Sequence, residues 1–268
     1  MSKSPLLRRP TAKTGRIHDV SPASAGWNHV GFGLSRLAAG EMAAGDTEER
    51  ELCLVLVSGK GRFSVNGKDL GELGERMSPF EGAPWAVYVP AGSRWQVEAT
   101  TELELAECTA PGGGDYPGRV IAPGTHPRVT RGKGNNIRHV YNIMPEDDGA
   151  ANALLVVEVI TPQGNTSSYP PHKHDQDDLP HESELEETYY HRLNPSQGFA
   201  FQRVYTDDRS LDEAIAVEDG DVVLVPRGYH PVATVAGYES YYLNVMAGPK
   251  RVWKFHNAPE HEWILGES

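Results

Sequence analysis

The segment Gly220-Asp-Val-Val-Leu-Val-Pro-Arg-Gly-Tyr-His230 decides the fold class, because part of it recurs in the first half of the chain. The earlier copy is Gly82-Ala-Pro-Trp-Ala-Val-Tyr-Val-Pro-Ala-Gly-Ser-Arg94, and the two copies share the core Val-Pro-x-Gly. In each copy a short apolar run ends at the Pro-x-Gly element, which is typical of a strand that leads into a tight turn. An internal repeat of this kind predicts two copies of one β domain.

The rest of the chain also indicates short strands rather than helices. No long segment shows the 3.6-residue apolar period of an amphipathic helix. Runs rich in β-branched or aromatic residues, bounded by Gly, Pro, Asn or Asp, occupy residues 52–57, 86–89, 154–160, 199–205, 221–225 and 241–245. With 268 residues, the chain is predicted to be all-β, a sandwich or barrel, and long enough for two fused domains. The Gly/Pro-rich stretch 111–118 favours a junction there, and we place the domains at 1–125 and 126–268.

Composition and charge exclude several classes of function. The net charge of −12 argues against a nucleic-acid surface, and it means that any anionic substrate needs a local basic group. No run of about 18 apolar residues is present, so we expect no membrane span, and segment 1–10 lacks the apolar core of a signal peptide. We therefore expect a cytoplasmic protein, in which Cys53 and Cys108 are reduced thiols of the core.

Four residues of the second half form a candidate metal set. His172 and His174 are one residue apart, so both lie on one face of a strand, and Glu187 and His230 would join them from other strands. Imidazoles and carboxylates bind divalent metals, and three nitrogen ligands with one oxygen ligand leave positions open for a substrate. The carboxylate has alternatives nearby in the sequence, namely Glu182, Glu184 and Glu186.

The first half does not carry the same set. Arg94 occupies the position that His230 has in the second copy of the repeat, and no His-x-His precedes Glu51. Only the second half is therefore expected to assemble a metal site. The first half would have a structural role, or would supply an interface or part of the pocket wall.

The segments around these residues resemble the two motifs of the cupin superfamily. The first motif corresponds to residues 164–198 and the second to residues 220–230, with Asn244 further on. The resemblance implies two tandem double-stranded β-barrels, a bicupin, in which the second barrel holds one metal through three histidines and one glutamate. It implies those roles for His172, His174, Glu187 and His230. Glu187 is favoured because it begins a strand, as the ligand of the family does, although an acidic loop lengthens the gap from His174.

A narrower resemblance covers essentially the whole chain. It is to the 5-deoxy-glucuronate isomerase family of myo-inositol catabolism, and it is densest in blocks 169–175, 185–190, 198–205, 225–231, 237–248 and 251–263. This resemblance implies conversion of 5-deoxy-D-glucuronate to 5-dehydro-2-deoxy-D-gluconate, an aldose–ketose isomerisation. The related uronate isomerase of pectin breakdown, which acts on a 5-keto-4-deoxyuronate, shares the fold and the reaction type and is the nearest alternative.

The implied reaction suits a divalent metal. A Lewis acid stabilises the enediolate that forms next to the substrate carbonyl, while a base moves a proton between C2 and C1. Zinc is the expected metal because no redox change is needed, and Mn, Fe, Co and Ni also suit the ligands. Tyr229 and Tyr242 are our candidates for catalysis. Nearby carboxylates, Tyr190, Tyr241 and a hydride-shift route are alternatives.

The substrate would be a small anionic sugar acid, so its carboxylate needs a cation. Arg203, on the predicted strand after Gly198, has the best position, and Arg227 and Lys173 are further candidates. Strand alternation predicts that Lys173 points away from its histidine neighbours.

Other classes of function remain open at this point. A cupin dioxygenase would use the same ligands with Fe, Ni or Cu and would depend on O2, whereas a noncatalytic sugar-binding bicupin would turn nothing over. Cupins often pair through sheet edges, so the resemblance is compatible with a homo-oligomer, either a dimer or a larger ring.

Overall fold

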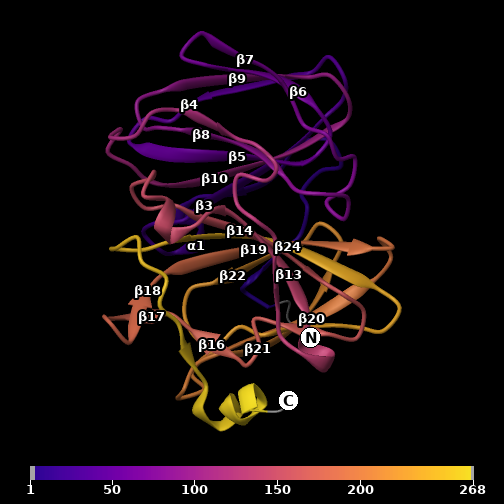
Figure 1. The fold of residues 1–268 in the computed structure, drawn as a ribbon, viewed down its shortest axis with the longest axis vertical. Helices are drawn as coiled ribbons and strands as arrows, with labels where there is room; N and C mark the ends of the chain where they lie inside the picture. The colour runs from indigo at the N-terminus through magenta and orange to yellow at the C-terminus, as the bar shows by residue number, and fades with distance from the viewer. Residues whose placement is uncertain (1–3, 267–268) are drawn as a thin grey trace. The chain divides into compact units, whose positions relative to one another are not determined.

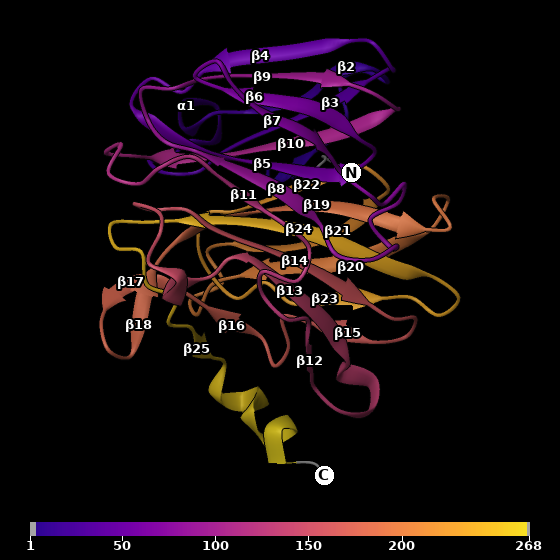
Figure 2. The same ribbon diagram turned by 45° about the horizontal axis from the view of Figure 1, so that its top comes forward.

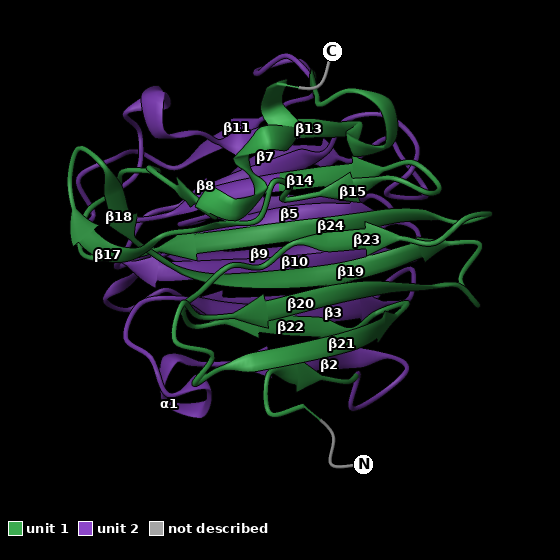
Figure 3. Ribbon diagram, turned by 90° about the horizontal axis from the view of Figure 1, so that it is seen from below, with its two compact units in different colours: residues 1–9, 129–140, 158–268 green, residues 10–128, 141–157 purple. Residues whose placement is uncertain are grey.

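The computed structural model describes residues 4–266, and β-strands dominate it, as the sequence predicts (Figure 1). The chain divides into two compact units, coloured separately in Figure 3. Unit 1 comprises residues 1–9, 129–140 and 158–268, and unit 2 comprises residues 10–128 and 141–157. The division is therefore not a single cut near residue 125, because residues 141–157 belong to unit 2 while the segments on either side of them belong to unit 1. Strands β13 and β14 each contribute residues to both units.

Unit 2 is a sandwich of two antiparallel sheets around an apolar core. One sheet has the order β11-β8-β5-β10-β3-β2 and the other the order β4-β9-β6-β7 (Figure 2). The core includes Leu52, Leu54 and Leu56 of β5 together with Phe63 and Val97 of the smaller sheet. The strands are β2 (Gly15–Val20), β3 (Gly31–Leu37), β4 (Met42–Asp46), β5 (Arg50–Ser58), β6 (Gly61–Val65), β7 (Lys68–Leu73), β8 (Trp85–Val89), β9 (Arg94–Ala99), β10 (Leu103–Pro111) and β11 (Arg119–Ile121), with the one-turn helix α1 (Pro22–Ala25) after β2.

Unit 1 contains most of a larger sheet and a set of smaller ones. A seven-stranded sheet has the order β1-β22-β19-β24-β14-β13-β12, and a four-stranded sheet has the order β15-β23-β20-β21. Two short pairs, β16-β25 and β17-β18, complete the set. The elements are β1 (Leu7–Arg8), β12 (Val129–Arg131), η1 (Gly134–Asn136), β13 (Arg138–Met144), η2 (Glu146–Asp148), β14 (Leu155–Thr161), β15 (Thr166–Ser167), β16 (His172–Lys173), β17 (Asp175–Asp178), β18 (Glu182–Glu184), β19 (Glu186–Asn194), β20 (Phe199–Tyr205), β21 (Asp212–Glu218), β22 (Val222–Val225), β23 (Val232–Thr234), β24 (Glu239–Ala247), β25 (His256–Asn257) and η3 (Pro259–Gly266).

The repeated Val-Pro-x-Gly element ends equivalent strands in the two units. Strand β8 ends at Val89 and pairs with β5, and strand β22 ends at Val225 and pairs with β19. The ladder places Leu52 opposite Val89 but Glu187 opposite Val225. The structural counterpart of Glu187 is therefore the core residue Leu52, not the adjacent Glu51. Since side chains alternate across a strand, this one-residue offset puts Glu51 on the opposite face of its sheet.

Two further predictions concern the core and the membrane. Cys53 and Cys108 are both buried and free, and they lie opposite each other on β5 and β10. Within residues 4–266, no helix combines the length and the apolar character needed to cross a membrane.

Candidate metal centre

Three of the four predicted ligands converge in the interior of unit 1. Oε2 of Glu187 lies 3.0 Å from Nε2 of His174 and 3.2 Å from Nε2 of His230. Glu187 is the second residue of β19, His174 follows β16, and His230 follows the turn after β22. All three side chains are almost completely buried. Residues far apart in the sequence thus place one carboxylate oxygen and two imidazole nitrogens within bonding range of a single point.

The outer nitrogens of both imidazoles are held by the backbone. Nδ1 of His174 lies 3.1 Å from the carbonyl oxygen of Leu185, and Nδ1 of His230 lies 2.8 Å from the carbonyl oxygen of Gly228. A carbonyl only accepts, so each Nδ1 carries the proton, and a neutral ring then has its lone pair on Nε2. This is the arrangement in which histidine binds metals, with the second nitrogen fixed by a hydrogen bond.

The electrostatics of the group also suit a cation. Burial lowers the pKa of His230 to about 3, so its ring is neutral near pH 7. Burial likewise opposes charge on His174, but the hydrogen bond and negative charge of Glu187 outweigh it, and the pKa of His174 is raised. Nε2 of His230 has no hydrogen-bond partner although it is buried. A divalent metal would satisfy this nitrogen and compensate the buried carboxylate, so the residues fit a metal.

His172, the fourth predicted ligand, lies beside this group rather than within it. Its ring centroid is 4.9 Å from that of His230 and 6.3 Å from that of His174. Its ring centroid also lies 4.7 Å from that of Phe255, and β16 pairs with β25 of the C-terminal segment. Burial lowers the pKa of His172 to about 3 as well, which leaves a neutral imidazole at the edge of the group.

The neighbouring glutamates do not compete with Glu187. The acidic loop forms the hairpin β17-β18, in which Glu182 accepts a hydrogen bond from the backbone of Asp175. Glu184 is exposed, and Glu186, which is adjacent to Glu187 on β19, projects from the opposite face of the strand. The structure therefore places only Glu187, of the four candidates, next to the imidazoles.

The turn before His230 is built around Gly228. Its φ is +89°, and a Cβ there would meet the carbonyl oxygen of Tyr205 at 2.4 Å, so both conformation and space require glycine. The amide of Gly228 donates to Asp175 at 2.8 Å, and its carbonyl holds His230. Through these two hydrogen bonds, the turn links Asp175 of the acidic hairpin to His230 and fixes the orientation of the His230 ring.

Polar side chains continue from the metal group along β19. Tyr189 and His191 share a face with Glu187, because residues two apart alternate together. Their rings stack with centroids 5.9 Å apart, and Nε2 of His191 lies 2.9 Å from Oε1 of Gln202 on β20. Neither residue belongs to a motif of the sequence, although strand alternation from Glu187 identifies both as interior positions.

The two predicted catalytic tyrosines lie in different places. Tyr242 is buried beside Tyr189, with centroids 4.9 Å apart, and its hydroxyl lies 3.4 Å from Oγ of Ser168. The Tyr229 hydroxyl instead donates to Asp207 at 2.9 Å, and its ring packs on Tyr205. Tyr229 neighbours His230 in the chain, so alternation turns it away from the metal group. The structure brings Tyr242 to the polar interior but does not bring Tyr229 there.

None of the three predicted cations, Lys173, Arg203 and Arg227, lies at the metal group as an unpaired charge. Lys173 points away from the histidines, as alternation predicts, and lies 3.1 Å from both Asp175 and Asp207. Arg203 is exposed on the outer face of β20, where Asp212 accepts two of its hydrogen bonds. Arg227 is exposed in the turn after β22.

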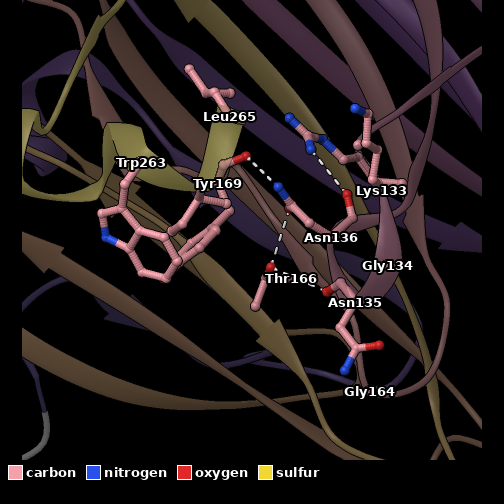
Figure 4. A pocket seen from close by; sticks show the side chains of 12 residues that line it. Lys133, Gly134, Asn135, Asn136, Gly164, Thr166, Tyr169, Trp263 and Leu265 are labelled. Atoms are coloured by element: carbon pink, nitrogen blue, oxygen red, sulfur yellow. Dashed lines mark hydrogen bonds between the residues drawn. The ribbon is translucent and has the colours of Figure 1, made fainter. Parts of the chain in front are cut away.

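A further cation, which belongs to no sequence motif, lies elsewhere in unit 1. Arg138, the first residue of β13, lines a cavity of about 690 Å³ that segment 132–136, Tyr169 and residues 263–265 also line. In Figure 4 the side chain of Asn136 points at the backbone of Tyr169, whose carbonyl accepts its hydrogen bond at 3.0 Å. Trp263, also labelled in Figure 4, lines the same cavity as Tyr169.

Comparison with known proteins places the chain in a family. The model of the KduI/IolB family matches residues 6–264. A protein of Geobacillus kaustophilus named 5-deoxy-glucuronate isomerase is 56% identical over 99% of this chain and 96% of its own length. A protein of the same name from Halalkalibacterium halodurans is 50% identical over 98% of this chain and 99% of its own length.

Solved structures support the same placement and confirm the predicted fold. An IolB-like protein from Salmonella typhimurium LT2 has a TM-score of 0.96 at 52% identity, covering 98% of this chain and 100% of its own. A variant of Bacillus subtilis oxalate decarboxylase, a cupin, has a TM-score of 0.65 at 12% identity, covering 100% of this chain and 82% of its own. The all-β bicupin fold is thus confirmed, and the chain belongs to the KduI/IolB family.

Proposed function

We propose that this protein is a metal-dependent aldose–ketose isomerase that converts 5-deoxy-D-glucuronate to 5-dehydro-2-deoxy-D-gluconate. The observation that carries the proposal is the convergence of His174, Glu187 and His230 at one buried point. The full-length relatives with the isomerase name support the same reaction. The substrate class, a small sugar acid, follows from that name.

The metal would be held by His174, Glu187 and His230, and His172, whose ring lies beside this group, is the proposed fourth ligand. Bound there, it would supply Lewis-acid stabilisation of the negative charge that develops on the substrate oxygens. We propose zinc, because isomerisation needs no redox change, although Mn, Fe, Co and Ni suit the same nitrogen and oxygen donors.

The tyrosines beside the metal group would act as neutral donors. Burial raises the pKa of Tyr242, and burial with the charge of Glu187 raises that of Tyr189, so both hydroxyls keep their protons near pH 7. Ser168, 3.0 Å from the Tyr189 hydroxyl, orients the pair. We assign Tyr242 the task of donating a hydrogen bond to a substrate oxygen and moving a proton between the oxygens on C1 and C2.

The net reaction transfers one hydrogen from C2 to C1 and moves the carbonyl from C1 to C2. The polar interior formed by Tyr189, His191, Gln202 and Tyr242 would replace water around the reacting carbons. A cytoplasmic location and association through sheet edges stay predictions.

The decisive experiment follows 5-deoxy-D-glucuronate by NMR in D2O, with protein of known metal content, before and after chelation. Chelator-sensitive formation of the keto acid is expected. Deuterium at the new CH2OH carbon would indicate proton transfer with solvent exchange, and its absence would indicate a hydride shift or a shielded proton. Metal-loaded protein that leaves this sugar unchanged would contradict the proposal.

A further inference from the structure

The cavity lined by Arg138 adjoins the polar interior of unit 1. Tyr169 forms part of its wall, and the preceding residue, Ser168, contacts the hydroxyls of Tyr189 and Tyr242. The charge of Arg138 also acts on Tyr242 and on His172. The cavity therefore lies next to the residues proposed to handle the reacting end of the substrate.

Arg138 is a cation without a counter-ion. Its Nη1 donates to the backbone carbonyl of Asn136 at 3.0 Å, and no carboxylate within residues 4–266 forms an ion pair with it. The side chain is half-buried, and burial, reinforced by the charge of Arg131, lowers its pKa. A guanidinium stays charged even so, and its free N–H groups match the two oxygens of a carboxylate.

Two of the other candidate cations are already neutralised, and the third, Arg227, is exposed in the turn after β22. Lys173 is surrounded by Asp175, Asp207 and Glu182, and Arg203 is bonded twice to Asp212. In a chain with a net charge of −12, an unpaired arginine that lines a cavity is a local site for an anion.

We propose that Arg138 binds the substrate carboxylate and so positions the sugar with its aldehyde end towards His174, Glu187 and His230. This inference rests on the proposed function and adds the residue that selects an acid over a neutral sugar. Tyr169 and Trp263 provide an aromatic wall, which suits the CH2 group that precedes the carboxylate in a 5-deoxy sugar.

The test compares two sugars on four proteins. The sugars are 5-deoxy-D-glucuronate and the neutral hexose in which a hydroxymethyl group replaces its carboxylate. The proteins are the wild type, Arg138→Met, Arg138→Lys and the matched control Arg203→Met, which removes an exposed, paired arginine of the same unit. Metal content and thermal unfolding are measured for each, so that a damaged fold is recognised.

For Arg138→Met we expect KM for the acid to rise about 10- to 100-fold, because a charged hydrogen-bonding partner is lost. The preference for acid over neutral hexose should fall by the same factor, and Arg138→Lys should recover part of it. Arg203→Met should keep the wild-type preference and KM.

An unchanged acid preference in Arg138→Met would overturn the inference, and so would its loss in Arg203→Met. These outcomes leave the proposed function intact, since the wild type would still isomerise the acid. A wild type that turns over neither sugar would instead contradict the proposed function.

Discussion

Two equivalent strands, β5 in unit 2 and β19 in unit 1, show how one fold supports a packed core in one place and a polar site in the other. The interior positions of β5 hold Leu52, Leu54 and Leu56, which pack against the opposite sheet. The interior face of β19 holds Glu187, Tyr189 and His191 instead. The scaffold is thus stable with either set, and chemistry depends on which residues occupy the interior positions.

The buried glutamates make the contrast sharper. Glu51 accepts hydrogen bonds from the Tyr88 hydroxyl and from the backbone amides of Asn152, Ala153 and Leu154, at 2.6–2.8 Å. Glu187 has no backbone amide donor in the metal group: it faces Nε2 of His174 and of His230, and the Tyr189 hydroxyl is its further neighbour. A carboxylate with four donors anchors a chain segment, whereas a buried carboxylate beside two imidazoles, one of which has an unpartnered Nε2, suits a bound cation.

The largest expected effect comes from removing a ligand in unit 1. His230→Ala should lower kcat/KM by about 1,000-fold or more and abolish metal binding, because several kcal/mol of Lewis-acid stabilisation are lost. The control is Arg94→Ala, which changes the sequence counterpart in unit 2 and should keep both properties. Metal analysis and NMR kinetics check this, and an active, metal-free His230→Ala would refute the site.

The second comparison separates the two predicted tyrosines. Tyr242→Phe should reduce kcat about 100-fold, since a proton donor in the polar interior is lost. Tyr229→Phe removes only the bond to Asp207 and should change kcat by less than about 3-fold. Equal losses in the two variants, at equal metal content, would contradict the separation that the structure makes.

The third comparison uses the glycines of the repeat. Gly92→Ala should cost about 1–2 kcal/mol of unfolding free energy, because its φ is +73° but the space around it is open. Gly228→Ala should cost more and weaken metal binding, because the new Cβ would collide with the Tyr205 carbonyl. Chemical denaturation and metal titration measure both, and equal costs would argue against the close approach.

The fourth comparison concerns Glu51. Glu51→Gln should lower the free energy of unfolding by about 2 kcal/mol, since a charged acceptor of four hydrogen bonds is lost. Metal content should not change, because Glu51 is no part of the metal group. A loss of metal without a loss of stability would reverse the roles given to the two glutamates.

The smallest expected effect is on pH dependence. Burial raises the pKa of Asp221 to about 6, and its buried Oδ1 accepts no hydrogen bond, unlike the carboxylate oxygens of Glu51. The folded state therefore favours the protonated carboxyl. The free energy of unfolding falls as pH rises from about 4 through 6, because this carboxyl must then ionise in the folded protein. Asp221→Asn should remove that pH-dependent loss. The unfolding free energy of the variant should therefore increase relative to that of the wild type as pH rises to about 7. A difference that is constant with pH would contradict this.

Sequence reasoning reached the fold because its signals are local. Short β-branched runs and the repeated Val-Pro-x-Gly fix strands and turns through neighbouring residues, and the resemblance to cupins supplied their arrangement. The pairing of segments 4–9 and 141–157 with distant strands carries no local signal. The exchanged segments between the units were therefore not predicted.

The sequence by itself determined which residues had metal-ligand chemistry: His172, His174, Glu187 and His230 stand out by type and spacing. Only the tertiary structure decided which tyrosine and which cation face the interior. Strand alternation turns Tyr229 and Arg203 outward, ion pairs neutralise Lys173, and Arg138 enters the cavity from a strand with no motif. The physical reason is that a ligand set is defined by atom type, whereas burial, pairing and direction depend on neighbours that are distant in sequence.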